Sequence, residues 1–241
     1  MNKTWLIAKR DFAEALHGVW GYAIVAAVLF VDGLMFNVFA MSRTAKYSHE
    51  VLGDFFYYTS GTTIIAAVLF TIRSFAEERQ TGTDVLLQTS PVSETQVVLG
   101  KYLAVMGIMT LLTVLTAYMP AMIFVNGKVS AGQIVTGYLG LLALASGTTA
   151  IGMFGSSLTR SQVVAAIISG VMVVSLLICW LLSQLTDPPF TSIIASMTLH
   201  DKHFLPFSEG RLLTQNLVYY ASVTYAFLML TTRILRGRRW Q

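Results

Sequence analysis

Residues 163–182 read VVAAIISGVMVVSLLICWLL, a run that contains no charged side chain. A helix of about 20 apolar residues is long enough to cross a hydrocarbon core about 30 Å thick. The chain of 241 residues is 55% hydrophobic and 12% charged, whereas about 25% of the residues of an average soluble domain are charged. This composition excludes soluble, disordered and disulfide-rich secreted proteins, and it indicates an integral membrane protein.

Five further apolar runs are bounded by charged residues, by Gly or Pro, or by polar clusters. Because every backbone polar group in lipid must be hydrogen-bonded within its own segment, we expect all six runs to be helices. The expected fold is an all-α integral membrane protein that forms one domain over residues 1–241. Its six predicted transmembrane helices lie at about residues 18–41, 55–72, 97–125, 133–158, 163–182 and 215–232.

The basic residues predict the orientation of these helices. Six spans put both termini on one side of the membrane, and 11 of the 16 Lys and Arg residues fall on that side. Since cytoplasmic loops carry an excess of Lys and Arg, we expect both termini to be cytoplasmic. The same residues are scattered between apolar runs, which argues against a nucleic-acid partner. The 11 residues are Lys3, Lys9, Arg10, Arg73, Arg79, Lys101, Arg160, Arg233, Arg236, Arg238 and Arg239, and the others are Arg43, Lys46, Lys128, Lys202 and Arg211.

The first 17 residues have an amphipathic pattern, with apolar residues on one helical face and mostly charged residues on the opposite face. We therefore expect residues 1–17 to form an interfacial helix along the cytoplasmic surface. The alternative is a helical extension of the first span. The apolar face holds Trp5, Ala8, Phe12 and Leu16, and the polar face holds Lys3, Arg10, Glu14 and His17.

The most polar internal stretch, residues 73–96, lies between the second and third predicted spans. Gly82 can end the helix that leaves the membrane. Thr83 or Asp84 can then cap a short amphipathic helix that lies parallel to the membrane. The apolar residues of this short helix are Val85, Leu86 and Leu87.

Two further signals complete this connection. Ser90-Pro91 closes the short helix with a turn, and Ser93 with Gln96 forms a capping box that starts the next long helix. The segment 183–214, between the fifth and sixth spans, is too long for a simple connection. We expect short extracytoplasmic helices there, and an ordinary extracellular flap is the alternative.

The motifs do not support nucleotide or metal binding by this chain. A P-loop requires G-x-x-x-x-G-K-[ST], because backbone amides and the lysine together hold the phosphates. Neither Gly100-Lys101 nor Gly127-Lys128 is followed by Ser or Thr. His200 and His203 have a spacing at which one helix could present both to a metal ion, but we expect them to be solvated in a polar outer loop.

Asp32 is the one acidic residue well inside a predicted span. Because an intramembrane carboxylate is costly, we expect it to face protein or water rather than lipid. It is a candidate for the substrate path or a subunit interface, and equally for a hydrogen-bonded packing residue. Small residues of the fourth span let a helix of this subunit, or of a second one, approach closely. They are Ser146, Gly147, Ala150, Gly152 and Ser156, of which Ser146, Gly147 and Gly152 are further candidates for the path or interface.

Three stretches of the chain together resemble a known family. Residues 75–83 read FAEERQTGT, residues 86–93 read LLQTSPVS and residues 97–101 read VVLGK, and these resemble the cytoplasmic coupling segment of ABC-2 type permeases. Residues 149–159, TAIGMFGSSLT, are also similar to that family. The tail from His203 to Arg211 and on to Trp240 resembles the gliding-motility-associated, GldF-like branch.

The resemblance implies an arrangement of subunits around this chain. Two six-helix permease subunits, in a homodimer or a heterodimer, would be driven by two cytoplasmic ABC ATPase subunits that bind the ATP and Mg²⁺. This chain would then be no enzyme and hold no cofactor. It would be a multi-pass exporter subunit of the bacterial inner membrane, in contact with the lipid bilayer, and an extracytoplasmic accessory protein is a further candidate partner.

The same resemblance points to the residues that would couple this chain to an ATPase. The apolar patch of the short helix would enter a groove on the ATPase, with charged residues around it as polar anchors. The alternative is a solvated loop whose apolar side faces the membrane. The candidate coupling residues are Glu77, Glu78, Arg79, Gly82, Thr83, Asp84, Val85, Leu86, Leu87, Ser90 and Pro91.

Two other classes of function compete with a permease. A non-transporting membrane anchor or assembly subunit of an ATPase-driven machine would have much the same sequence features. A secondary transporter would need polar or charged residues inside several spans to bind ions. Only Asp32 clearly meets that need, so the secondary transporter is the less supported of the two.

Overall fold

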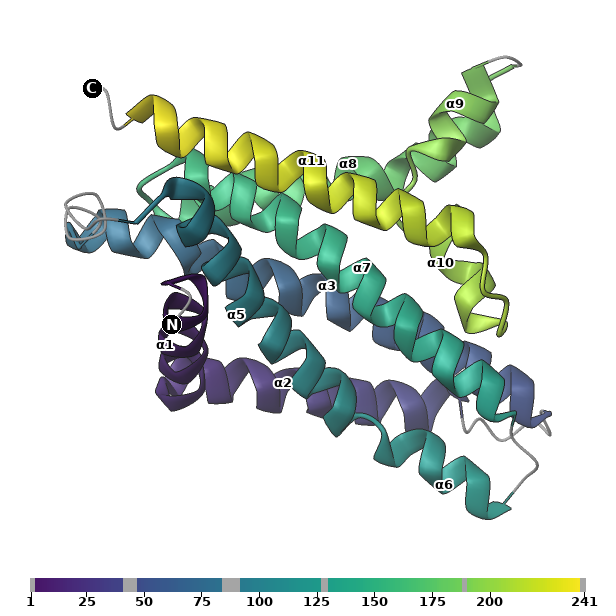
Figure 1. Ribbon diagram of the computed structural model, residues 1–241. Helices are drawn as coiled ribbons and strands as arrows, with labels where there is room; N and C mark the ends of the chain where they lie inside the picture. Colours follow the sequence, from purple (N-terminus) through teal and green to yellow (C-terminus); the bar gives the residue numbers. More distant parts are fainter. Residues whose placement is uncertain (1–2, 41–46, 84–91, 127–129, 188–189, 239–241) are drawn as a thin grey trace.

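The computed structural model describes residues 3–40, 47–83, 92–126, 130–187 and 190–238. Nearly all of them are helical, and the described part contains no strand (Figure 1). The helices are α1 (Lys3–His17), α2 (Val19–Met35), η1 (Phe36–Ala40), α3 (Ser48–Thr81), α5 (Glu94–Leu115), α6 (Tyr118–Asn126), α7 (Ala131–Leu158), α8 (Gln162–Leu185), α9 (Phe190–Ser196), α10 (Asp201–Ser208) and α11 (Thr214–Arg238).

The long helices lie alongside one another, and α1 crosses them near one end (Figure 1). That end also holds the last turn of α3, the start of α5 and the C-terminal part of α11, and we call it the basic end. The opposite end holds α6 and α10, and we call it the α10 end. Two short helices, α9 and α10, lie within the predicted 183–214 segment.

Among the described residues, five helices are long and apolar enough to cross a membrane. They correspond to the first five predicted spans. The sixth predicted span, 215–232, lies within α11, which is 25 residues long but less apolar than the other five. The all-helical membrane fold is therefore confirmed, whereas the six-span topology and the side of the termini stay predictions. The five helices are Val19–Phe39, Ser48–Thr81, Glu94–Ile123, Ala131–Leu158 and Gln162–Leu185.

The third predicted span, 97–125, is interrupted between α5 and α6. Pro120 has no amide hydrogen, so it cannot donate to the Thr116 carbonyl as the corresponding residue of a continuous helix would. The Met119 amide donates to that carbonyl instead, at 3.0 Å. The predicted span therefore consists of two helical pieces joined at Thr116, which together form the candidate membrane span Glu94–Ile123.

The helix α1 packs on α5 through a residue outside the predicted apolar face. Ile7 is 8% exposed, and a Cβ at Gly100 of α5 would lie 2.8 Å from its side chain. Trp5, which belongs to the predicted apolar face, is 61% exposed. Ala8, which also belongs to the predicted apolar face, is 4% exposed, so that face is only partly open, and the interfacial position of α1 stays a prediction.

The helix α7 packs closely against α3 because small residues face it. A Cβ at Gly152 would lie 2.0 Å from Oγ1 of Thr71. The Ser156 hydroxyl donates to the Ile72 carbonyl of α3 at 2.7 Å, and it accepts from the Phe75 amide at 3.1 Å. A helix of the same chain therefore occupies the close approach that the small residues predict.

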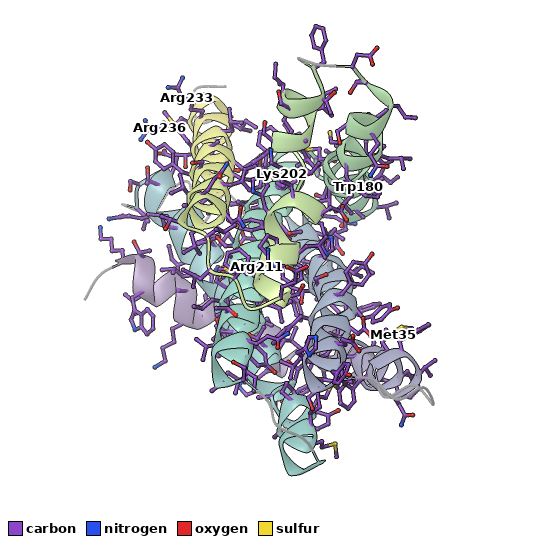
Figure 2. All side chains as sticks on the ribbon, turned by 90° about the vertical axis from the view of Figure 1, so that its right-hand side faces the viewer. Met35, Trp180, Lys202, Arg211, Arg233 and Arg236 are labelled. Atoms are coloured by element: carbon purple, nitrogen blue, oxygen red, sulfur yellow. The ribbon has the colours of Figure 1, made fainter. Side chains whose placement is uncertain are left out.

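The helices α2 and α8 are the least covered of the five. In the most apolar 18-residue stretch of each helix, only 11% of the residues of α2 and 17% of those of α8 are buried, compared with 56% in each of the other three. Met35, at the end of α2, and Trp180 of α8 lie on the side of the bundle away from Arg233 and Arg236 of α11 (Figure 2). Both helices thus keep broad apolar faces for lipid or for another subunit.

A Gly152→Ala substitution should destabilise the protein by about 1–3 kcal/mol, the usual cost of overpacking. Thr71 is β-branched and stiff at χ1, so it cannot move away easily. The matched control is Gly170→Ala on α8, where an added Cβ meets no atom within 4 Å. Thermal unfolding of both variants in detergent checks this, and equal unfolding midpoints would contradict the close contact.

Candidate functional site

A lysine buried between two carboxylates joins three helices at the basic end. The Lys101 ammonium of α5 lies 2.7 Å from Glu78 Oε1 of α3 and 3.3 Å from Asp11 Oδ2 of α1. Arg10 Nη2 lies 3.3 Å from the same Glu78 oxygen and 2.8 Å from Asp11 Oδ1. We call Arg10, Asp11, Glu78 and Lys101 the Lys101 cluster.

Pairing makes the burial of this lysine tolerable. The Lys101 side chain is 4% exposed, and those of Asp11 and Glu78 are 16% and 19% exposed. An unpaired buried ion costs several kcal/mol, but two cations and two carboxylates here balance one another. The Phe75 ring, with its centroid 5.4 Å from the ammonium, adds a cation–π contact.

The environment of Arg10 favours the charged form of its guanidinium. Burial by itself lowers the pKa of the Arg10 guanidinium, but the nearby carboxylates of Asp11 and Glu78 outweigh it, and the net pKa is raised. Sequence reasoning did not identify the cluster as a site. The signal was present, because Lys101 falls inside the predicted span 97–125, where a charged residue needs a partner.

Two of the predicted anchors, Glu77 and Arg79, are engaged within the chain next to this cluster. Glu77 Oε2 accepts a hydrogen bond from Arg73 Nε at 2.6 Å. The Arg79 guanidinium donates to the Ser157 carbonyl and, at 3.4 Å, to the Thr159 carbonyl. A cation at the C-terminal end of a helix is favourable, so Arg79 ties the last turn of α3 to the end of α7.

A cavity of about 420 Å³ opens between α1, α2, α3 and α5 beside the Lys101 cluster. Its lining includes the charged residues Asp11, Glu77, Glu78 and Lys101. Apolar residues such as Ile108 of α5 also line it. The cavity explains why the two carboxylates of the cluster keep part of their exposure although the lysine between them is buried.

Both flanks of the predicted coupling segment have the predicted geometry. The helix α3 ends at Thr81, and Gly82 has a φ of 72°, the left-handed conformation that favours glycine at a helix end. The Ser93 hydroxyl accepts from the Gln96 amide at 3.3 Å, and the Gln96 side chain accepts from the Ser93 amide at 3.2 Å. Thr83 is described, whereas Asp84, Val85, Leu86, Leu87, Ser90 and Pro91 lie outside the described residues.

The carboxyl group of Asp32 is buried between α2 and α3, as expected for an acid that faces protein. Asp32 is 2% exposed, and its Oδ1 lies 2.5 Å from Thr62 Oγ1. The Thr62 hydroxyl also lies 2.9 Å from the Thr59 carbonyl. The Thr62 hydroxyl of α3 thus donates to the carboxyl group of Asp32 and links α2 to α3.

The small-residue candidates of α7 contact other helices of this chain. Ser146 Oγ lies 2.7 Å from Tyr102 Oη of α5 and 2.7 Å from Thr224 Oγ1 of α11. A Cβ at Gly147 would lie 3.4 Å from the Tyr220 ring of α11. These contacts leave the predicted roles of Ser146, Gly147 and Gly152 in a path or a subunit interface untested.

Two histidines of the α10 end are buried, so the expectation that they are solvated is wrong. His200 and His203 are 9% and 3% exposed. His203 Nδ1 lies 3.0 Å from Asn216 Oδ1 and its Nε2 lies 3.2 Å from the Ser196 carbonyl. The His203 ring also stacks on Tyr219, with centroids 3.8 Å apart. These contacts attach the 183–214 segment to α11.

His200 lies in a row with Ser60 and Asp201 that has the residue types of a hydrolytic triad. Ser60 Oγ is 2.7 Å from His200 Nε2, and His200 Nδ1 is 3.6 Å from Asp201 Oδ1. Ser60 is fully buried, and its hydroxyl also contacts the Tyr57 carbonyl at 2.6 Å. A substrate carbonyl has no access to such a hydroxyl, so the row is a structural link between α3 and α10.

Comparison with protein families identifies the chain. The model described as ABC-2 family transporter protein matches residues 5–224, and the chain therefore belongs to that family. A search of curated proteins finds no match. Membership makes the chain a multi-pass membrane component of an ABC transporter that works with an ABC ATPase and a permease partner.

Replacing Lys101 with Met should destabilise the protein by about 3 kcal/mol, because two partly buried carboxylates lose their shared partner. The control is Arg73→Met, which breaks a pair whose side chains are 38% and 33% exposed, and which should cost about 1 kcal/mol or less. Thermal unfolding in detergent measures both. If the two substitutions lowered the unfolding midpoint equally, the Lys101 cluster would contribute no more to stability than the exposed pair does.

The stability of the α10 end should depend on pH through His200. Burial lowers the pKa of His200 from its ordinary value, although Asp201 opposes that effect. The unfolded state therefore binds more protons below about pH 6.5, and the free energy of unfolding should fall as the pH drops through that range. His200→Phe keeps an aromatic ring and should flatten this part of the curve. Unfolding midpoints between pH 5 and 7.5 test it, and identical slopes in both proteins would refute it.

Proposed function

We propose that this chain is the permease subunit of an ABC exporter in the bacterial inner membrane. Two ATPase subunits would bind and hydrolyse ATP with Mg²⁺, and a second permease subunit, identical or related, would complete the pathway. The basic end would face the cytoplasm, as the 11 basic residues indicate. We also propose that the chain belongs to the gliding-motility-associated, GldF-like branch, which its C-terminal tail resembles.

The observation that supports the proposal is the ion pair between Glu78 of α3 and Lys101 of α5. These two helices flank the coupling segment. The segment from Asp84 to Pro91 connects these two helices, and the Lys101 cluster holds them together with α1. A force on the segment therefore acts on three helices at once. An element of this kind is suited to transmit the closure of a nucleotide-bound ATPase pair.

Because α3 is long, it would transmit a movement of the coupling segment to the opposite end of the bundle. It has 34 residues, which corresponds to about 50 Å of continuous helix. Its last turn is tied to α7 through Arg79, and its first half contacts α10 through Ser60 and His200. Tilting of α3 at the basic end would thus reach the α10 end, and alternating access would follow from that motion.

The polar groups inside the bundle are the candidates for the path that such a motion would open. Asp32 and Thr62 lie where α2 meets α3, and Ser146 links α5, α7 and α11. Gly147 and Gly152 allow the neighbouring helices to approach and would tolerate sliding. The uncovered faces of α2 and α8 are available for the second permease subunit.

Docking on the ATPase can be tested with the double substitution Leu86→Ser/Leu87→Ser. Each buried leucine contributes about 1.5–3 kcal/mol, so the double variant should lose most of the bound ATPase. The tagged chain is purified from its native membranes in mild detergent, and ATP hydrolysis in the eluate is measured. The purified chain freed of its partner should neither bind nor hydrolyse ATP.

The matched control is Leu212→Ser/Leu213→Ser, which replaces two adjacent leucines that are each 48% exposed near the α10 end. It should keep the wild-type amount of ATPase. Equal loss or equal retention in the two double variants would exclude residues 84–91 as the docking element. Retained docking without ATP-dependent transport in proteoliposomes would instead favour the anchor or assembly role.

A further inference from the structure

A groove of about 570 Å³ runs between α5 and α11 and ends at two arginines. Its α11 wall consists of residues spaced three or four apart, which places them on one face of the helix. Its α5 wall is the short stripe Thr95, Val98 and Leu99. The residues of the α11 wall are Tyr225, Leu228, Met229, Thr232, Arg233 and Arg236.

The polarity of the groove changes along its length. The part nearer the membrane centre is apolar and open, since Tyr225 is 71%, Met229 42% and Leu99 40% exposed. At the basic end Arg233 and Arg236 project outward from α11 (Figure 2). Arg236 Nη2 lies 3.4 Å from Thr95 Oγ1, and Arg236 Nε lies 4.0 Å from Glu94 Oε2.

The length of the groove fits one leaflet of a bilayer. From Tyr225 to Arg236 the helix rises about 16 Å, and half of a hydrocarbon core is about 15 Å thick. The apolar wall therefore has the depth of an acyl chain, and the arginines lie at the level of the headgroups. Arginine is well suited to phosphate, because its planar guanidinium can form two parallel charge-assisted hydrogen bonds.

We propose that this groove is a binding site for an anionic phospholipid of the leaflet at the basic end. The phosphate lies between Arg233 and Arg236, and one acyl chain follows the stripe of Leu99, Leu228 and Met229. The membrane-spanning position of α11 and the naming of this leaflet as cytoplasmic both rest on the proposed topology. A lipid held here would brace the start of α5, and with it the Lys101 cluster, against the end of α11.

A second copy of this chain is a poorer occupant of the groove. In a two-fold symmetric contact the same surface meets itself, so Arg233 and Arg236 would face their own counterparts. Like charges juxtaposed in a contact cost several kcal/mol. The carboxylate of Glu94, 4.0 Å from Arg236, is on the α5 side of the groove and would be duplicated with the arginines.

The test compares phosphatidylglycerol with phosphatidylcholine of the same acyl chains. The purified full chain in mild detergent is titrated with each lipid, and bound lipid and unfolding midpoints are measured by native mass spectrometry and thermal unfolding. We expect about tenfold tighter binding of phosphatidylglycerol, because phosphatidylcholine has the same phosphate but also a choline cation, which cancels its net charge and is repelled by the arginines. Equal binding of the two lipids would overturn the proposal.

Two variants separate the headgroup from the chain. Arg233→Gln/Arg236→Gln should remove the preference for phosphatidylglycerol. Lys202→Gln/Arg211→Gln should keep it, because it removes the same charge in α10 and just after it, at the other end of the bundle (Figure 1). Met229→Trp fills the apolar part and should weaken binding of phosphatidylglycerol with both arginines in place. If the two Gln pairs behaved alike, the effect would be general surface charge and the site would be refuted.

Other occupants give distinct results. Inorganic phosphate alone should not raise the unfolding midpoint, and a shift equal to that with lipid would show a simple anion site. Loss of a dimer in Arg233→Gln/Arg236→Gln, at unchanged lipid binding, would assign the groove to a subunit contact. Neither outcome affects ATPase co-purification, so failure of this proposal is distinguishable from failure of the permease assignment.

Discussion

The close approach of α7 to α3 is the contact on which the rest of the bundle depends. Lipid is as apolar as leucine, so the hydrophobic effect does not press helices together within a bilayer, and packing of small residues must do so. Gly152 leaves no side chain between the two helices, and the Ser156 hydroxyl links them by hydrogen bonds. This contact positions everything that α3 carries, from Ser60 near α10 to Glu78 in the Lys101 cluster.

The two ends of α3 are held by different kinds of interaction. At the basic end charges meet in a partly open cavity, where Lys101 has two carboxylate partners. At the α10 end Ser60 and His200 meet in a buried environment with stacked aromatic rings. The carboxylates of Asp11 and Glu78 keep part of their exposure to the cavity, whereas Ser60 is fully buried. The basic end is therefore the more open of the two to water.

The sequence predicted what depends on near neighbours in the chain. Gly82 ends a helix because of its own backbone, and Ser93 with Gln96 caps the next helix within one turn. Contacts between distant residues were missed, since Lys101 and Asp11 are 90 positions apart, and Ser60 and His200 are 140 apart. Loop position suggested that His200 and His203 are solvated, but the fold of the 183–214 segment buries them. The interruption at Thr116 could be predicted from the sequence, because Pro120 cannot donate a hydrogen bond to the Thr116 carbonyl.

The modest apolarity of α11 bears on the biogenesis of the protein. For this helix to cross the bilayer, Asn216 and Thr224 need partners that lipid does not supply. The Oδ1 atom of Asn216 and the hydroxyl of Thr224 find partners in His203 and Ser146, and both of these residues precede α11 in the chain. During synthesis the earlier helices would therefore already be in the membrane when α11 emerges, and they would lower the cost of its insertion. The order of the helices along the chain thus favours insertion of α11 after its partners. The same segment placed first would be a poor membrane anchor.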